Sequence, residues 1–308
     1  MTAIAPTIRR AEAAFPGRNG FIAFAVRQCP CLGGTVDPPL DYDLFVVPSD
    51  GAPLRQVTQG SLDFDVQPAW APDGRRIAFT RGSPLQGGAD IYVMKHPGGA
   101  PKNLTKSPGT VDFGAAWSPD GRYIAFNSDQ ENPELIAWVL RVEPQGDLFV
   151  MEANGTNVVQ LTSGPGGEIS PSWSPDGRWI AFIDTELQRV GLIHPDGSGR
   201  KVLSPGRGAG PVHSVAWSPD GQKIVYSTGD GDIWVATSEG TQQTNLTERS
   251  NAENTAPVWS PDGRYIAFVS NREGPFKLFR MASNGSRVVK LTDIELYADT
   301  TPDWGPRP

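Results

Sequence analysis

The chain has 308 residues and a formal net charge of −7, and glycine and proline contribute 35 and 29 of its residues. Without a collagen period, and with 38% apolar residues, this composition indicates many tight turns rather than disorder. The negative charge argues against a general nucleic-acid binder, which needs a basic stripe, and no apolar run approaches the roughly 18 residues of a membrane span.

The N-terminal segment has two arginines but no apolar core of signal-peptide length behind them. We expect a cytoplasmic protein, or a periplasmic one if a leader has been removed, because a shortened chain with an added Met would look the same. Residues 1–14 are expected to be an N-terminal extension. Cys29 and Cys31 are too close for an ordinary disulfide, and a metal site would need partners elsewhere, so we expect two loop thiols.

A strand–turn–strand unit recurs along the chain. Trp117–Phe126 and Trp259–Phe268 share one sequence, WSPDGRYIAF, and looser copies begin at Trp70, Trp173 and Trp217. Proline, aspartate and glycine in this order favour a tight turn, and the apolar run that follows favours a strand. We expect the aspartates of these turns to be turn formers rather than catalytic groups: Asp73, Asp120, Asp176, Asp220 and Asp262.

The spacing of the repeat predicts the fold. Tryptophans at positions 70, 117, 173, 217, 259 and 304 are 47, 56, 44, 42 and 45 residues apart. In each repeat a third strand follows the Ile-Ala-Phe strand, and after a glycine-bearing turn a fourth strand ends in Leu-Thr or a variant. Periods of about 40–50 residues with four strands each are typical of propeller blades. The sequence predicts an all-β fold, a single six-bladed β-propeller over residues 15–308.

The two ends of the chain predict how the ring closes. The first strand of the chain, Gly20–Phe24, is of the Ile-Ala-Phe type, and no tryptophan strand comes before it. The last strand, Thr301–Trp304, is a tryptophan strand, and no Ile-Ala-Phe strand follows it. We expect the C-terminal strand to join the first blade, which leaves only short outer edges exposed. The competing interpretation aligns Phe15 with the tryptophan position and treats Trp304 as a tail.

The repeated P-x-W-S-P-D-G-R-x-I-A-F pattern resembles the propeller of TolB-type proteins over nearly the whole chain. That family includes the periplasmic TolB protein, whose propeller binds a lipoprotein partner, and the propeller domains of prolyl-oligopeptidase-like peptidases. The sequence shows neither a separate α/β domain ahead of the repeats nor a hydrolase domain behind them. We therefore expect neither function to carry over cleanly.

The turns of a propeller alternate between its two faces. All Pro-Asp-Gly turns belong to one face, and the opposite face, called the top face here, carries the insertions at Gln28–Leu40, Gly82–Ala89 and Asp129–Gly146. Variable loops on a regular scaffold are where binding residues concentrate, so we expect the binding site on the top face.

Acidic residues recur five positions before the tryptophans. Four of the six positions are acidic, and the full set is Asp65, Asp112, Glu168, Val212, Asn254 and Asp299. Converging on one axis, Asp65, Asp112, Glu168 and Asp299 would form a site for Ca²⁺ or, second, Mg²⁺. The alternative is that each acid ends a loop by bonding nearby backbone.

Three more residues are candidates on the top face. His213 lies next to this register and is either a polar residue of the channel wall or a catalytic base, and Asn254 is a candidate ligand contact. The insertion near residue 135 carries an apolar run in which Trp138 could anchor a ligand or partner, cover the channel, or pack against a blade.

These patterns favour a binding module that uses its top face and channel mouth for a protein or small-molecule partner. The alternative is a metal-dependent enzyme, lactonase-, lyase- or cyclase-like, at the top of the central channel, a hypothesis that rests on fold-level analogy. The sequence predicts no nucleic-acid partner and no membrane span, and leaves the ligand and the oligomeric state open.

Overall fold

The computed structural model describes residues 17–27, 41–59, 63–83, 88–129, 146–164, 166–203, 210–298 and 300–308. The predicted N-terminal extension, Phe15 and both cysteines lie outside these ranges. All regular structure in the described part is β-strand. No helix there is long and apolar enough to cross a membrane.

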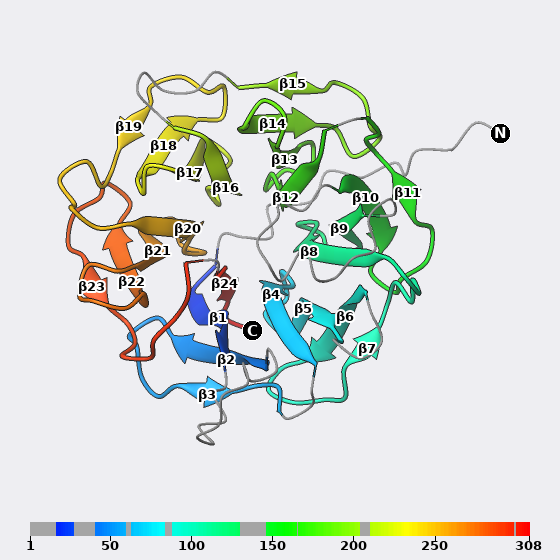
Figure 1. Cartoon of the computed structure of the whole chain (residues 1–308), viewed down its shortest axis with the longest axis horizontal. Coiled ribbons are helices and arrows are strands. Elements are labelled where there is room, and N and C mark those ends of the chain that lie inside the picture. Colours follow the sequence, from blue (N-terminus) through cyan, green and yellow to red (C-terminus); the bar gives the residue numbers. More distant parts are fainter. Residues whose placement is uncertain are drawn as a thin grey trace, which may run out of the picture.

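The described strands form groups of four, and Figure 1 shows these groups as blades around a central axis. The innermost strands are β4 (Phe64–Trp70), β8 (Val111–Trp117), β12 (Glu168–Trp173), β16 (Val212–Trp217), β20 (Asn254–Trp259) and β24 (Asp303–Pro306). The second strands are β1 (Asn19–Arg27), β5 (Arg76–Gly82), β9 (Tyr123–Asp129), β13 (Ile180–Asp184), β17 (Lys223–Thr228) and β21 (Tyr265–Ser270).

The outer half of each blade follows the same order. The third strands are β2 (Tyr42–Pro48), β6 (Ala89–Lys95), β10 (Asp147–Glu152), β14 (Arg189–Ile193), β18 (Ile233–Thr237) and β22 (Lys277–Ala282). The outermost strands are β3 (Arg55–Gln56), β7 (Lys102–Asn103), β11 (Val159–Gln160), β15 (Lys201–Val202), β19 (Thr244–Asn245) and β23 (Val289–Lys290). Neighbouring strands within a blade are antiparallel. The protein is therefore an all-β propeller, as the sequence predicts.

The C-terminal strand belongs to the blade that begins the chain. β24 pairs antiparallel with β1, and Trp304 lies opposite Ile22. β24 thus takes the innermost position beside β1, where the sequence places it. How far this pairing holds the ring together in solution stays a prediction, which a truncation tests.

The recurring turn is built by its own side chains. In the copy at Ser118, the serine hydroxyl donates to Asp120 Oδ1 at 2.7 Å and accepts from the Tyr123 N–H at 2.9 Å. Gly121 has φ of +67°, a conformation that glycine adopts without a steric penalty. Serine and aspartate make the same bonds in the copies at Ser174, Ser218 and Ser260. The Pro-Asp-Gly aspartates are turn formers.

A second repeated bond fixes the outer strands. Asp90, near the start of β6, accepts from Thr105 Oγ1 at 2.9 Å and from Asn103 Nδ2 at 2.8 Å. Thr105 in turn accepts the Ile91 N–H at 3.1 Å. Equivalent aspartate–threonine contacts occur in three other blades: Asp43–Thr58, Asp147–Thr162 and Asp232–Thr247. The Leu-Thr ending recurs in these blades because its threonine bonds the aspartate at the start of the third strand.

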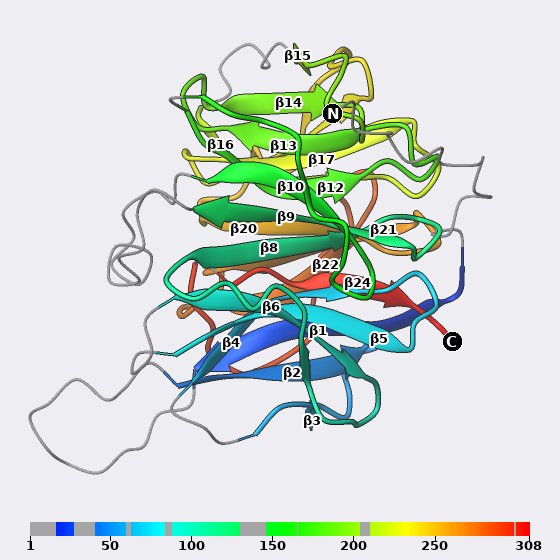
Figure 2. The same ribbon diagram turned by 90° about the vertical axis from the view of Figure 1, so that its right-hand side faces the viewer.

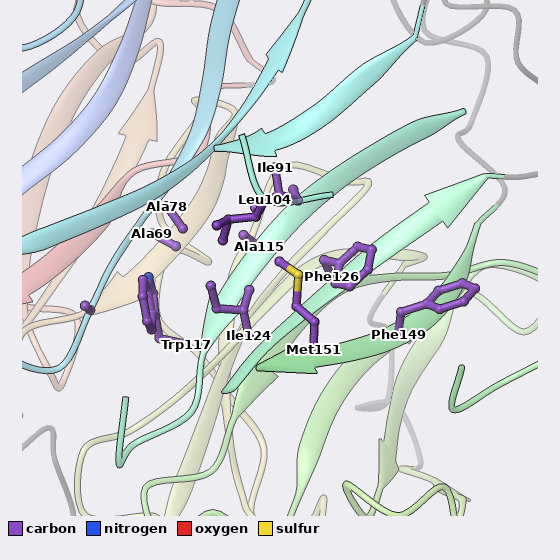
Figure 3. Close-up of a cluster of buried hydrophobic side chains, with 11 residues drawn as sticks. Ala69, Ala78, Ile91, Leu104, Ala115, Trp117, Ile124, Phe126, Phe149 and Met151 are labelled. Carbon is purple, nitrogen blue, oxygen red and sulfur yellow. The ribbon is translucent and has the colours of Figure 1, made fainter. Parts of the chain in front are cut away.

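The core lies between neighbouring blades. One buried cluster joins Ala69, Ala78 and Ile91 of one blade to Trp117 and Phe126 of the next, and Figure 3 shows these side chains in the gap between the two sheets. Because the blades are twisted sheets packed face to face, each tryptophan is covered by the preceding blade. Burial of such a residue contributes several kcal/mol.

The cluster between the last blade and the first has the same construction. Trp304 and Phe24 of the first blade pack with Val269 and Leu278 of the last. On the other side of β24, Gly305 lies against Trp70 so closely that a Cβ at position 305 would overlap the indole ring. β24 is therefore packed tightly on both sides.

Candidate functional site

The top face is formed by the strand ends that carry the residues five positions before the tryptophans. This set of residues is called the five-back register here. Figure 2 shows the strands lying across the view, with the C-terminus on the right and the top face on the left. Across each blade these residues lie opposite the end of the second strand, in the pairs Asp65–Arg81, Asp112–Ser128, Glu168–Asp184, Val212–Thr228 and Asn254–Ser270. Asp299 lies outside the described residues.

Asp65 forms a two-pronged ion pair within its own blade. Its two carboxylate oxygens accept from Arg81 Nε at 2.6 Å and from Arg81 NH2 at 2.7 Å. The guanidinium also lies over the rings of Phe79 and Tyr92, with 5.4 and 5.1 Å to the centroids. The Asp65 side chain is only 4% exposed, so the arginine is what balances its charge.

Glu168 is paired in a similar way. Arg200 lies between two acids, with NH1 at 2.7 Å from Glu168 Oε1 and NH2 at 2.6 Å from Asp184 Oδ2. The pKa of Glu168 is raised, because burial disfavours the charged form more than Thr162 and Arg200 favour it. The glutamate and the aspartate thus share one arginine at the surface.

The two remaining polar positions of the register are buried without an ion pair. Burial also raises the pKa of Asp112, whose neighbours are the hydroxyls of Ser128 and Thr105. Asn254 is completely buried: its amide donates to the Gly231 and Ala252 carbonyls, and its oxygen accepts from Ser270 and Arg272. Asn254 therefore has little hydrogen-bonding capacity left for a ligand.

The sequence predicts a shared metal site for the described acids of the register, Asp65, Asp112 and Glu168. No group of three or more His, Cys, Asp or Glu side chains suited to a metal ion occurs among the described residues. The positive charge next to Asp65 and Glu168 comes from arginine. The Ca²⁺ or Mg²⁺ site proposed for these acids, with Asp299 as the fourth, stays a prediction.

The structure describes His213 but not Trp138. His213 lies on β16, is exposed, and packs beside Gly229. Within the described ranges, none of the acids of the register hydrogen-bonds to it. Trp138 lies outside the described residues, so its role stays a prediction.

A cavity of about 190 Å³ occupies the central channel, but away from this register. It is lined by the last four residues of the inner-strand repeats and by turn prolines, including Pro175, Pro219 and Pro261. The cavity therefore lies toward the face of the Pro-Asp-Gly turns. None of the five described residues of the five-back register lines it.

Bulges shape the wall of this channel. The pairing of the inner strands with the second strands shifts register just before the tryptophans, for example between Phe113 and Ala116. At two of these bulges a side chain of the preceding blade accepts the N–H that the shift frees: Gln67 Oε1 accepts from Gly114 N at 3.0 Å, and Asn127 Oδ1 from Ser170 N at 3.1 Å. Each of these bonds ties an inner strand to the blade before it.

One residue of the channel wall was missed from the sequence. Asp303 precedes Trp304, and its Oδ2 accepts the Trp70 N–H at 2.6 Å. Burial raises the pKa of Asp303 to about 6, against the lowering effect of the Trp70 and Trp304 N–H groups. The sequence does set Asp303 apart, because the residues before the other five tryptophans are uncharged: Ala69, Ala116, Ser172, Ala216 and Val258.

Fold and site together define an all-β propeller with a narrow central channel. Residues 136–308 match the family model of the TolB beta propeller domain. This match covers more than half of the chain, and the chain belongs to that family.

Curated relatives match over shorter stretches. The chain is 48% identical over 54 residues to the "Uncharacterized peptidase YuxL" of Bacillus subtilis (strain 168), which is 17% of this chain and 8% of that protein. It is 31% identical over 127 residues to the "Protein TolB homolog" of Chlorobium chlorochromatii, which is 41% of this chain and 29% of the homologue. The matches thus span less than a third of the length of these relatives.

Solved structures agree on the fold. TolB from Acinetobacter baumannii superposes with a TM-score of 0.71 at 20% identity, covering 94% of this chain and 67% of that one. A chain of the Nidogen/Laminin complex superposes with a TM-score of 0.69 at 11% identity, covering 93% and 98%. At these identities the likeness shows the fold alone.

Proposed function

We propose that this TolB-family propeller is a binding module that docks a protein partner on its top face. The observation that carries the proposal is the inequality of its connections. Residues 28–41 and 130–146 join second to third strands at the top face, whereas residues 185–188 and 229–232 suffice for the same step in other blades. Long connections on a rigid scaffold supply binding surfaces.

The strand ends that flank residues 28–41 carry residues suited to a protein interface. Arg27 donates to Tyr297 Oη at 3.3 Å and lies over its ring, with 5.6 Å to the centroid. Tyr42 meets Tyr297 edge-on at 6.2 Å, and Tyr297 is 37% exposed. Tyrosine and arginine are the residue types that dominate binding energy at protein interfaces.

A protein partner is also consistent with the similar proteins. One solved propeller with this fold comes from a complex of two proteins, nidogen and laminin. No observation among the described residues favours the alternative of a metal-dependent enzyme. Asp65 and Glu168 are bound to arginines, and His213 has no acid of the register as a hydrogen-bond partner.

Matched arginine variants test the proposal. Arg280 lies over the ring of Tyr265, 4.5 Å from the centroid, in the half of its blade that carries the Pro-Asp-Gly turn. It therefore makes the same kind of arginine–tyrosine contact as Arg27 and Tyr297, but at the opposite face of the propeller. Tagged protein is used to capture partners from an extract of its source cells, identified by mass spectrometry. We expect Arg27→Ala to lose a specific protein that wild type and Arg280→Ala both retain. Equal capture by all three proteins, or no specific protein in any of them, would contradict the proposal.

A further inference from the structure

The cavity in the central channel is a separate site from the top face. Its walls are the inner-strand residues just before and at the tryptophans, and Figure 1 shows these strands surrounding the axis. A cavity of about 190 Å³ exceeds the roughly 150 Å³ that accepts a benzene molecule in an engineered protein core. A compact molecule with a short chain or a single ring fits this space.

Asp303 gives the cavity its charge. Among the described residues that line it, Asp303 is the only ionisable one. The others are apolar side chains, prolines, tryptophans, and polar neutral groups such as Gln67, Ser172 and Ser214. The wall of the cavity is therefore neutral except at one point.

The Asp303 carboxylate also has no counter-charge in the described structure. It forms no ion pair with a described residue, unlike Asp65 and Glu168, although it is held in place by the Trp70 N–H. Burial without a counter-charge disfavours ionisation, which agrees with its pKa of about 6. Asp303 as a whole is only partly buried and lines the cavity, so a cation in the cavity can reach its carboxylate and supply the missing counter-charge.

The rest of the wall offers neutral polar groups rather than further charges. Beside the cavity, the described pairings of the inner strands from β4 to β20 are with their second strands, so the other edges present backbone N–H and C=O groups to the channel. The parallel contacts of Phe64 with Tyr42 and of Val111 with Ala89 lie at the top-face ends of β4 and β8.

Two serine hydroxyls of the wall add acceptors. Ser172 Oγ accepts the Trp217 N–H at 3.3 Å and Ser214 Oγ is bonded to Ser227 Oγ at 2.7 Å, and each oxygen keeps a lone pair that can accept from a ligand. An ammonium group, with three donors and no acceptor, matches one carboxylate together with neighbouring carbonyl and hydroxyl oxygens. A metal ion matches it less well, because the described residues provide no group of three ligands.

We propose that the lower channel is a binding site for a small organic ammonium ion, with Asp303 as its counter-charge and the cavity walls enclosing its apolar part. This site lies on the side of the Pro-Asp-Gly turns and does not depend on the top-face partner.

The test uses benzylammonium as probe, with benzyl alcohol as its neutral counterpart of similar shape. Binding is measured by calorimetry at pH 7.5. We expect benzylammonium to bind in a one-to-one ratio and benzyl alcohol to bind at least tenfold more weakly. Equal binding of both molecules, or none of either, would overturn the proposal.

Variants locate the binding. Asp303→Asn keeps an oxygen that can accept the Trp70 N–H, and we expect it to bind benzylammonium at least tenfold more weakly than wild type. Asp50→Asn makes the same charge change at an exposed turn on the same face and should bind as wild type does. Arg27→Ala should also bind normally, which separates this proposal from the proposed function. Unchanged binding by Asp303→Asn would overturn the assignment.

The pH dependence of binding by the wild-type protein tests the same claim without a variant. It can be measured even if Asp303→Asn fails to fold. Since Asp303 gains a proton as the pH falls through about 6, wild type should bind benzylammonium at least fivefold more weakly at pH 5 than at pH 7.5. Benzylammonium stays charged over this range. Affinity that does not change with pH would contradict the role of Asp303.

Discussion

Asp303 and Trp70 are 233 residues apart in the sequence, yet the carboxylate of one accepts the backbone N–H of the other at 2.6 Å. Asp303 lies on β24, which pairs with β1, whereas Trp70 ends β4 in the next blade. The bond therefore ties the C-terminal strand, and with it the first blade, to the next blade.

Removal of the C-terminal strand should destabilise the whole propeller. Deletion of residues 299–308 takes away Trp304, which is buried against the last blade, and uncovers Trp70 in the next. The loss of several kcal/mol is comparable to the stability of a small domain. We expect insoluble protein or a much lower Tm in thermal melts, whereas deletion of the exposed residues 307–308 should have a small effect. An unchanged melt of the longer truncation would argue against closure by β24 and revive Phe15 as the blade marker.

Gly305→Ala should destabilise the same seam without shortening the chain. A Cβ at this position would overlap the Trp70 ring, and overpacking of a filled core costs about 1–3 kcal/mol. Gly98→Ala is the matched control, because a Cβ there meets nothing within 4 Å. Urea unfolding of both variants measures the difference. If the two variants are equally stable, β24 does not pack on Trp70 as described.

Asp303→Asn should change how stability depends on pH. The pKa of Asp303 is about 6 in the folded protein, against an ordinary value of 3.8, so the folded state holds this proton more tightly. Its contribution to stability is full below about pH 4 and is lost as the pH rises through 6. Relative to wild type, the variant should gain on the order of 1–3 kcal/mol between pH 4 and pH 7, measured by urea unfolding. Parallel stability curves would contradict the raised pKa.

Arg81→Ala should leave Asp65 buried without a counter-charge. The two side chains are 21% and 4% exposed, and breaking a buried pair by removing one partner costs about 3–5 kcal/mol, somewhat less at this exposure. The exposed Arg178–Asp176 pair, at 64% and 55%, is the control, and Arg178→Ala should change stability by less than about 0.5 kcal/mol. Similar losses in both variants would show that the Asp65 pair is not a structural ion pair.

The cation hypothesis has its own readout in the melting temperature. If the acids of the top face hold Ca²⁺, added Ca²⁺ raises Tm by mass action and Asp112→Asn weakens that rise. Identical melts in Ca²⁺ and in EDTA would contradict the hypothesis and leave arginine as the partner of Asp65 and Glu168.

The strands of the fold were predictable because their signals are local. Trp117–Phe126 contains the end of β8, the turn with its serine, and the start of β9 within ten residues, and each bond of that turn joins residues no more than five apart. The position of β24 beside β1 was predictable by counting, since each end of the chain lacked the strand that the other supplied.

The site was less predictable because its determinants are contacts between distant residues. The register placed Asp65 and Glu168 correctly at the ends of inner strands, but Arg200, 32 positions after Glu168, pairs with it only through the folded blade. The sequence likewise shows an aspartate before Trp304 but not that it lines the cavity, because this depends on the packing of β24 against β4.

Hydrogen–deuterium exchange with and without the captured protein tests the top-face proposal most directly. If the partner docks there, amides around Arg27, Tyr42 and Tyr297 become protected on binding, and the Pro-Asp-Gly turns exchange as before. Protection confined to those turns, with unchanged exchange at the top face, would contradict the proposed function.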